Sequence, residues 1–70
     1  MGERDVERDT TRDEFVATLR RVADSLEAGE SFRIQVVNSR FTVPADAKLS
    51  IEHEAEDGDN ELEFQLKWQD

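Results

Sequence analysis

The 70-residue sequence contains no cysteine, no tyrosine, one proline and only two lysines. Without cysteine, no disulfide can stabilise the fold and no thiolate is available for catalysis or metal binding. No apolar run approaches the ~20 residues of a membrane span, and the charged N-terminus does not resemble a signal peptide. We therefore expect a cytoplasmic protein that has no membrane partner.

The short length also limits the function. A chain of this size forms one domain with a thin core, because it buries only about 60% of the surface that its unfolded form exposes. No deep catalytic cleft is expected, and no nucleophile–base pair or metal constellation can be assembled from the residues present. We predict that the protein is not an enzyme and that it needs no cofactor.

Acidic residues dominate the charge. Eighteen Asp and Glu residues oppose nine Lys and Arg residues, so the net charge is −9. Excess acid with scarce lysine favours a halophilic protein, because a Debye length of about 3 Å near 1 M salt screens the self-repulsion. An ordinary acidic protein from a non-halophile is the alternative. In both cases nucleic acid is not an expected partner, because this surface repels phosphates.

Residues 11–29 form the only long helical pattern in the chain. Thr11 and Glu14 match a capping box at its start, and Gly29 can close it in the left-handed conformation. The spacing of the apolar residues predicts one buried helix face. That face consists of Phe15, Val16, Leu19, Val22, Ala23 and Leu26.

Four strands are predicted after the helix, because the apolar period changes from 3.6 to two residues. Their ranges are 31–37, 40–43, 49–55 and 61–68. Asn38-Ser39 is the expected two-residue turn of the first hairpin, and this turn would pair Val36 with Phe41. In the second hairpin, Ile51 pairs with either Phe64 or Leu66. The sequence does not decide between these two registers.

The simplest assembly of these elements is an α+β two-layer sandwich. One N-terminal amphipathic helix packs on a four-stranded antiparallel meander, in the order α-β-β-β-β. Residues 10–70 form this single domain. Residues 1–9 are predicted to be a flexible charged arm, because they carry too little apolar surface to offset the entropy of ordering. A short strand centred on Val6 is the alternative.

The helix EFVATLRRVADSLEAGE, the short strand pair and the closing ELEFQLKW resemble the amphi-Trp domain. The resemblance covers residues 10–68, and the tryptophan for which this family is named corresponds to Trp68. It implies a small stand-alone protein of a kind common in halophilic archaea. It implies no activity, cofactor or partner.

We predict a non-enzymatic interaction module that binds a protein partner or a second copy of itself, through a sheet edge or the open sheet face. The candidate interaction surface consists of Val37, Arg40 and Trp68. Trp68 either packs in the core or stays partly uncovered as an anchor for the partner. Arg40 either contributes to a small positive area with Arg20, Arg21 and Arg33, or forms an ion pair with Glu52 or Glu54 on the neighbouring strand.

The alternative function is a cation- or small-ligand-binding module that uses the acidic hairpin 56–61. Asp57, Asp59 and Glu61 would converge around Gly58, although the order of a calcium loop is missing. The only histidine, His53, is expected to be structural or partly exposed, with catalysis or pH sensing as alternatives.

Overall fold

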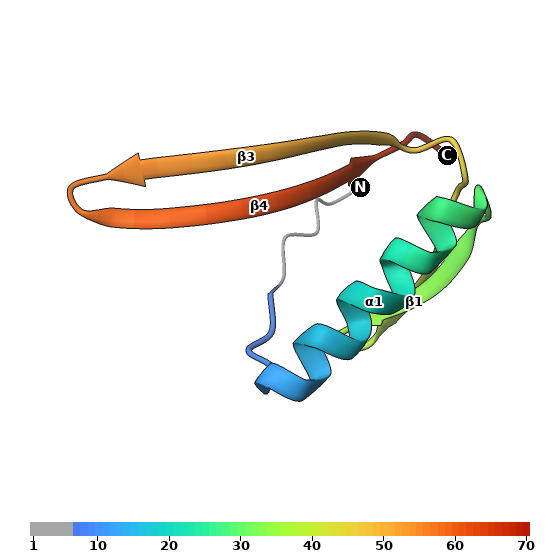
Figure 1. Cartoon of the computed structure of the whole chain (residues 1–70), viewed down its shortest axis with the longest axis horizontal. Coiled ribbons are helices and arrows are strands. Elements are labelled where there is room, and N and C mark those ends of the chain that lie inside the picture. The colour runs from blue at the N-terminus through green and yellow to red at the C-terminus, as the bar shows by residue number, and fades with distance from the viewer. Residues whose placement is uncertain (1–6) are drawn as a thin grey trace.

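The computed structural model describes residues 7–70 and confirms the α+β class and the α-β-β-β-β order (Figure 1). The elements are α1 (Arg12–Ala28), β1 (Phe32–Val36), β2 (Ser39–Val43), β3 (Lys48–Glu56) and β4 (Asp59–Lys67). Most of the predicted flexible arm, including the alternative strand at Val6, lies outside the described residues. Residues 7–9 have no regular secondary structure.

Helix α1 begins and ends where its capping residues predict. The Glu14 N–H donates to Thr11 Oγ1 (3.2 Å), and the Thr11 N–H donates to Glu14 Oε1 (3.4 Å). This capping box satisfies two donors that the first helical turn leaves unpaired. At the other end, Gly29 has a φ of 69° and donates its N–H to the Leu26 carbonyl oxygen (3.1 Å).

Strands β1 and β2 form the first hairpin, in a different register from the predicted one. The turn residues are Val37 and Asn38, so Phe32 lies opposite Val43 and Ile34 lies opposite Phe41. The predicted Asn38-Ser39 turn is wrong by one residue. It would have placed Phe32 opposite Ala45, beyond Pro44, which cannot donate to a ladder. The observed register keeps apolar residues on one face and uses the full length of both strands.

Strands β3 and β4 form a second and longer hairpin. Its turn is Asp57-Gly58, and both residues have positive φ values of 53° and 85°. Two positive φ values define a type I′ turn, for which Asp-Gly is a favoured sequence. The turn selects one of the two predicted registers, because it places Ile51 opposite Phe64.

The two hairpins form separate two-stranded sheets instead of one continuous meander. Strands β2 and β3 are not neighbours, because the connection between them turns the chain, with a hydrogen bond from the Ala47 N–H to the Pro44 carbonyl oxygen (3.2 Å). The strands also differ in length, with five residues in β2 and nine in β3. The second hairpin therefore extends away from the first (Figure 1).

The core is correspondingly small. Val43, which is 4% exposed, is the one buried hydrophobic residue among those described. Seven further large apolar side chains, from α1, the first hairpin and the C-terminal end of the chain, are half-buried: Val22, Leu26, Phe32, Ile34, Phe41, Leu66 and Trp68.

The predicted burial of the helix face is wrong for Phe15, Val16, Leu19 and Ala23, which are exposed, and only Val22 and Leu26 of that face are half-buried. A five-residue hairpin spans about 17 Å, whereas the 17 residues of α1 span about 25 Å. The first hairpin is therefore too short to cover the whole of α1.

Candidate interaction surfaces

The β3–β4 hairpin carries an uncovered apolar face. Strand alternation and register place Leu49, Ile51, Leu62 and Phe64 on the same side of this hairpin. These side chains are 55%, 68%, 68% and 61% exposed, respectively. We call these four residues the apolar hairpin face. Monomeric proteins rarely expose several large apolar side chains next to one another. A contiguous apolar patch of this kind marks an interaction site.

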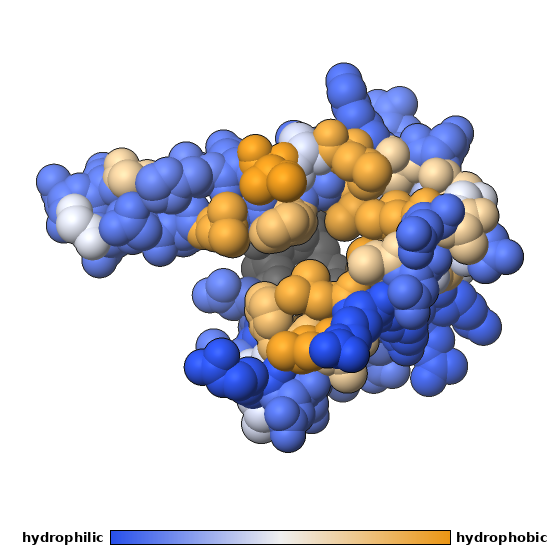
Figure 2. All heavy atoms as spheres, in the orientation of Figure 1, coloured by the Kyte–Doolittle hydropathy of each residue, from blue (hydrophilic) through white to orange (hydrophobic). Residues whose placement is uncertain are grey.

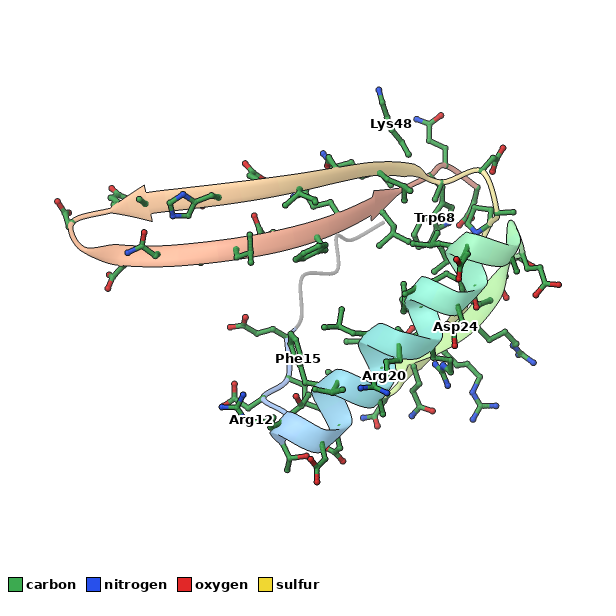
Figure 3. All side chains as sticks on the ribbon, viewed as in Figure 1. Arg12, Phe15, Arg20, Asp24, Lys48 and Trp68 are labelled. Carbon is green, nitrogen blue, oxygen red and sulfur yellow. The ribbon has the colours of Figure 1, made fainter. Side chains whose placement is uncertain are left out.

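A second apolar area lies on α1. Phe15, which is 58% exposed, projects from α1 towards the side on which the β3–β4 hairpin lies (Figure 3). Figure 2 shows apolar side chains on the hairpin and on the helical part of the molecule, with the two areas on different arms of the fold. Each area is therefore available to an apolar surface of another molecule.

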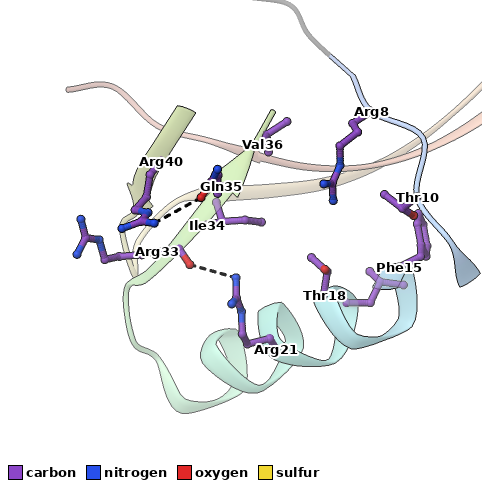
Figure 4. A pocket seen from close by; sticks show the side chains of 11 residues that line it. Arg8, Thr10, Phe15, Thr18, Arg21, Arg33, Ile34, Gln35, Val36 and Arg40 are labelled. Carbon is purple, nitrogen blue, oxygen red and sulfur yellow. Dashed lines mark hydrogen bonds between the residues drawn. The ribbon is translucent and has the colours of Figure 1, made fainter. Parts of the chain in front are cut away.

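An open groove of about 660 Å³ lies between α1 and β1 (Figure 4). Phe15, Leu19 and Ile34 contribute apolar side chains to it. Its charged lining is entirely basic among the described residues and consists of Arg8, Arg21, Arg33 and Arg40. Arg21 Nη2 donates to the Arg33 carbonyl oxygen (3.2 Å), which links α1 to β1 across the groove. The groove thus combines apolar side chains with four guanidinium groups.

Arg40 lies in the first of its two predicted environments, an area of basic side chains that includes Arg21 and Arg33. Arg40 Nη2 donates to Gln35 Oε1 (3.5 Å) on the paired strand. The predicted ion pair with Glu52 or Glu54 required β2 to lie beside β3, and these strands are not neighbours. The side chain of Arg40 instead lines the groove together with the other three arginines.

The three predicted interaction residues do not form one surface. Val37 is exposed at the turn of the first hairpin, and Arg40 follows on β2. Trp68 is half-buried and stacks on Phe41, with ring centroids 6.0 Å apart and planes inclined by 29°. Because Phe41 and Arg40 are adjacent in β2, their side chains point to opposite faces of the sheet. Trp68 thus packs on the face opposite to that of Arg40.

The opposite face of the long hairpin is polar and acidic. Glu52 lies directly opposite Glu63 in the ladder, and Gln65 Nε2 donates to Glu52 Oε1 (3.0 Å). Carboxylate oxygens of Glu52, Glu54 and Glu63 lie within 4.8 Å of one another. Loss of hydration raises the pKa of Glu63, and its hydrogen bond with Glu52 and the neighbouring carboxylates raise this pKa further.

The tip of the same hairpin is also acidic. A hollow of about 240 Å³ brings together the predicted Asp57, Asp59 and Glu61, and also Glu54 and Glu56. Between residues 52 and 63 the sequence has seven carboxylates and neither lysine nor arginine. We call these carboxylates the acidic tip. The hairpin is thus apolar on one face and strongly negative towards its end.

The sequence model of the Amphi-Trp domain matches residues 2–70. The chain belongs to the Amphi-Trp domain family. No curated protein and no solved structure shows a significant match to it.

In this Amphi-Trp domain, Trp68 joins the end of the long hairpin to the first hairpin through its stack on Phe41. His53 is exposed on the apolar side of the long hairpin, and its Nε2 lies 2.9 Å from Asn60 Oδ1. Within residues 7–70, no helix is both long and apolar enough to cross a membrane.

Sequence reasoning assigned the apolar hairpin face to the core of the Amphi-Trp domain. The predicted strand lengths did not reveal this error, because the first and third predicted strands, 31–37 and 49–55, are equally long. In the structure β3 and β4 have nine residues each, whereas β1 and β2 have five each, so the first hairpin is too short to cover the second. The predicted positive area already contained Arg21, Arg33 and Arg40, whereas Arg8 was not identified as a groove residue.

Proposed function

We propose that this protein is a non-enzymatic protein-interaction module whose main contact surface is the apolar hairpin face. The observation that carries the proposal is the exposure of Leu49, Ile51, Leu62 and Phe64 on one side of a projecting hairpin. Fully burying a side chain of this kind is worth about 1.5 to 3 kcal/mol. Four of them contribute up to about 6 to 12 kcal/mol, against which the entropic cost of association is set.

The sheet edges offer a second mode of contact on the same elements. Each of the four described strands has one hydrogen-bonded neighbour strand. A strand from a partner can therefore extend either sheet by backbone hydrogen bonding. The polar face of the long hairpin restricts this contact, because a partner that approaches from that side meets the acidic cluster.

Site-specific photo-crosslinking tests this function. We would place a benzophenone side chain at Ile51, on the apolar hairpin face, and at Ser50, on the opposite face, as the matched control. In concentrated KCl, position 51 should form a discrete adduct, identified by mass spectrometry, and position 50 should form little. Equal labelling from both positions, or from neither, would contradict the proposal.

A second candidate function is cation or small-ligand binding by the acidic tip. The hollow lined by Glu54, Glu56, Asp57, Asp59 and Glu61 favours it, because hard cations prefer several carboxylate oxygens. A titration with Mg²⁺ and Ca²⁺ in molar KCl, followed by NMR, tests this function. Saturable shifts confined to residues 54–61 and weakened by Asp59→Asn would support it. Small uniform shifts would exclude it.

We also propose that the protein works in the cytoplasm of a halophile. The support is compositional: 18 acidic residues against nine basic ones, of which two are lysine. The facing pair Glu52 and Glu63 supports it as well, because like charges directly opposite each other destabilise a sheet in dilute buffer. Thermal unfolding should show a higher midpoint in about 2 M KCl than in about 0.1 M KCl.

A further inference from the structure

The chain leaves more surface in solvent than a compact fold of its size. Its accessible surface is 6524 Å², whereas a compact monomer of 8.1 kDa exposes about 4,500 Å². By the scaling for an unfolded chain, residues 1–6 contribute at most about 1,000 Å² of the difference. About 1,000 Å² remains, and each partner in a standard protein–protein interface buries about 800 Å².

The dimensions lead to the same conclusion. The radius of gyration is 13.5 Å, whereas a compact domain of this length has about 11 Å. One buried side chain, Val43, is a small core even for a chain of this size. A fold with this much open apolar surface gains stability when that surface is covered.

The long hairpin and α1 are similar in length. Each nine-residue strand of the hairpin spans about 30 Å, and α1 spans about 25 Å. The hairpin can therefore lie along a helix like α1, and the apolar hairpin face, which spans about 13 Å of it, can cover the part of the helix that carries Phe15 and Leu19. Within one chain the hairpin and α1 diverge (Figure 1).

The charges of the two surfaces are also complementary. The acidic tip carries seven carboxylates, whereas the groove beside α1 carries four arginines and, among the described residues that line it, no acidic residue. Complementary potentials of this kind steer association and set the register of a complex. They orient the hairpin so that its negative end, and not its base with Lys48 and Lys67, approaches the groove.

We propose that two copies of this chain form a twofold-symmetric dimer in which the β3–β4 hairpin of each copy lies against α1 in the arginine-lined groove of the other. The apolar hairpin face then covers Phe15 and Leu19 of the second copy. This inference rests on the proposed function and identifies the partner as a second copy. Two equivalent hairpin–groove contacts close the assembly, as a twofold axis requires.

The first test is the mass in solution, measured by light scattering behind size exclusion in about 2 M KCl, where the net charge is screened. The expected mass is twice 8.1 kDa. Ile51→Arg should weaken association by at least about 30-fold, as expected for a buried interface residue. Ser50→Arg, on the opposite face of the same strand, should leave the dimer intact.

A charge-exchange experiment tests which surfaces meet. One variant combines Arg33→Glu with Arg40→Glu in the groove, and the other combines Asp57→Arg with Asp59→Arg at the turn that ends the hairpin. In about 0.2 M KCl, where screening is weaker, each variant alone should lose the dimer because like charges meet. An equimolar mixture should recover the dimer mass, because both contacts of the heterodimer then join opposite charges. No recovery would contradict the hairpin–groove contact.

Paramagnetic NMR provides a test that does not depend on disrupting the interface. The chain has no cysteine, so Asp59→Cys accepts a single spin label at the tip. Mixed with a ¹⁵N-labelled unmodified copy, it should broaden the amides of groove residues such as Thr18 and Arg21 in that copy. Broadening confined to another surface would overturn the proposed dimer while leaving the protein an interaction module.

A monomeric mass at every concentration would also overturn the dimer, and Ile51→Arg then separates two cases. If this variant stays folded, the apolar hairpin face is free in the monomer and the proposed function stands with a different partner. If it unfolds, the hairpin packs within its own chain, and the dimer and the proposed function both fail.

Discussion

Trp68 and Phe41 stack with their ring centroids 6.0 Å apart, and this contact joins the end of the long hairpin to β2. The two sheets share no strand pairing. The aromatic pair therefore connects the two hairpins, which in a continuous four-stranded sheet would be connected by backbone hydrogen bonds. Trp68 has a structural role, because its stack on Phe41 holds the base of the hairpin that presents the apolar surface.

Trp68→Ala should lower the free energy of unfolding by about 1 to 3 kcal/mol, because a half-buried ring and one aromatic pair are lost. Chemical denaturation in molar KCl, followed by circular dichroism, measures this change. Trp68→Phe is the matched control and should retain most of the stability. An unchanged midpoint for the alanine variant would show that the stack does not couple the two hairpins.

Val37→Gly should raise the free energy of unfolding by about 1 kcal/mol. Val37 has a φ of 58°, a conformation in which a β-branched residue is strained and glycine is not. Glycine followed by asparagine also suits a two-residue hairpin turn. Thermal unfolding of Val37→Gly and of the control Asn38→Gly checks this, and an equal gain from both would argue against strain at Val37.

Stability should rise as the pH falls from neutral towards the ordinary glutamate pKa of 4.5, because the pKa of Glu63 is raised in the folded state. The folded protein binds this proton more tightly than the unfolded chain does. The stabilisation is complete below the unfolded pKa and is lost as the pH rises through the folded pKa.

Thermal midpoints measured across this pH range in molar KCl test the effect. Glu63→Gln should raise the midpoint at neutral pH and flatten the profile, whereas Glu30→Gln, outside the hairpin, should keep the profile of the unmodified chain. A midpoint that falls steadily from neutral pH to pH 4.5 in the unmodified chain would contradict the prediction.

Val43→Ala and Phe64→Ala should differ in how their effects depend on protein concentration. Val43 is buried within the chain, so its truncation should cost about 2 kcal/mol at every concentration. Phe64 is exposed in the single chain, where truncation should change stability by less than about 0.5 kcal/mol. In a dimer its cost appears as weaker association, so unfolding curves at several concentrations separate the two residues.

Much of the fold could be predicted because the decisive signals lie close together in the chain. The capping box of Thr11 and Glu14 and the left-handed Gly29 mark the helix ends within one turn. The alternation of apolar residues assigns the faces of each strand correctly. The turn of the first hairpin was missed because a valine occupies a position that local preference gives to asparagine, and the pairing of Phe32 with Val43 outweighs that preference.

The candidate surfaces were likewise predictable only where they depend on residues close together in the chain. The sequence by itself determined the helix, the four strands, the apolar and polar side of each hairpin and the acidic tip, because these depend on neighbours a few residues apart. Only the tertiary structure decided that the sheet is split, that Leu49, Ile51, Leu62 and Phe64 stay in solvent and that four arginines line one groove. The physical reason is that burial depends on which elements meet in space, and apolar periodicity shows which face of an element needs a partner without showing which surface supplies it.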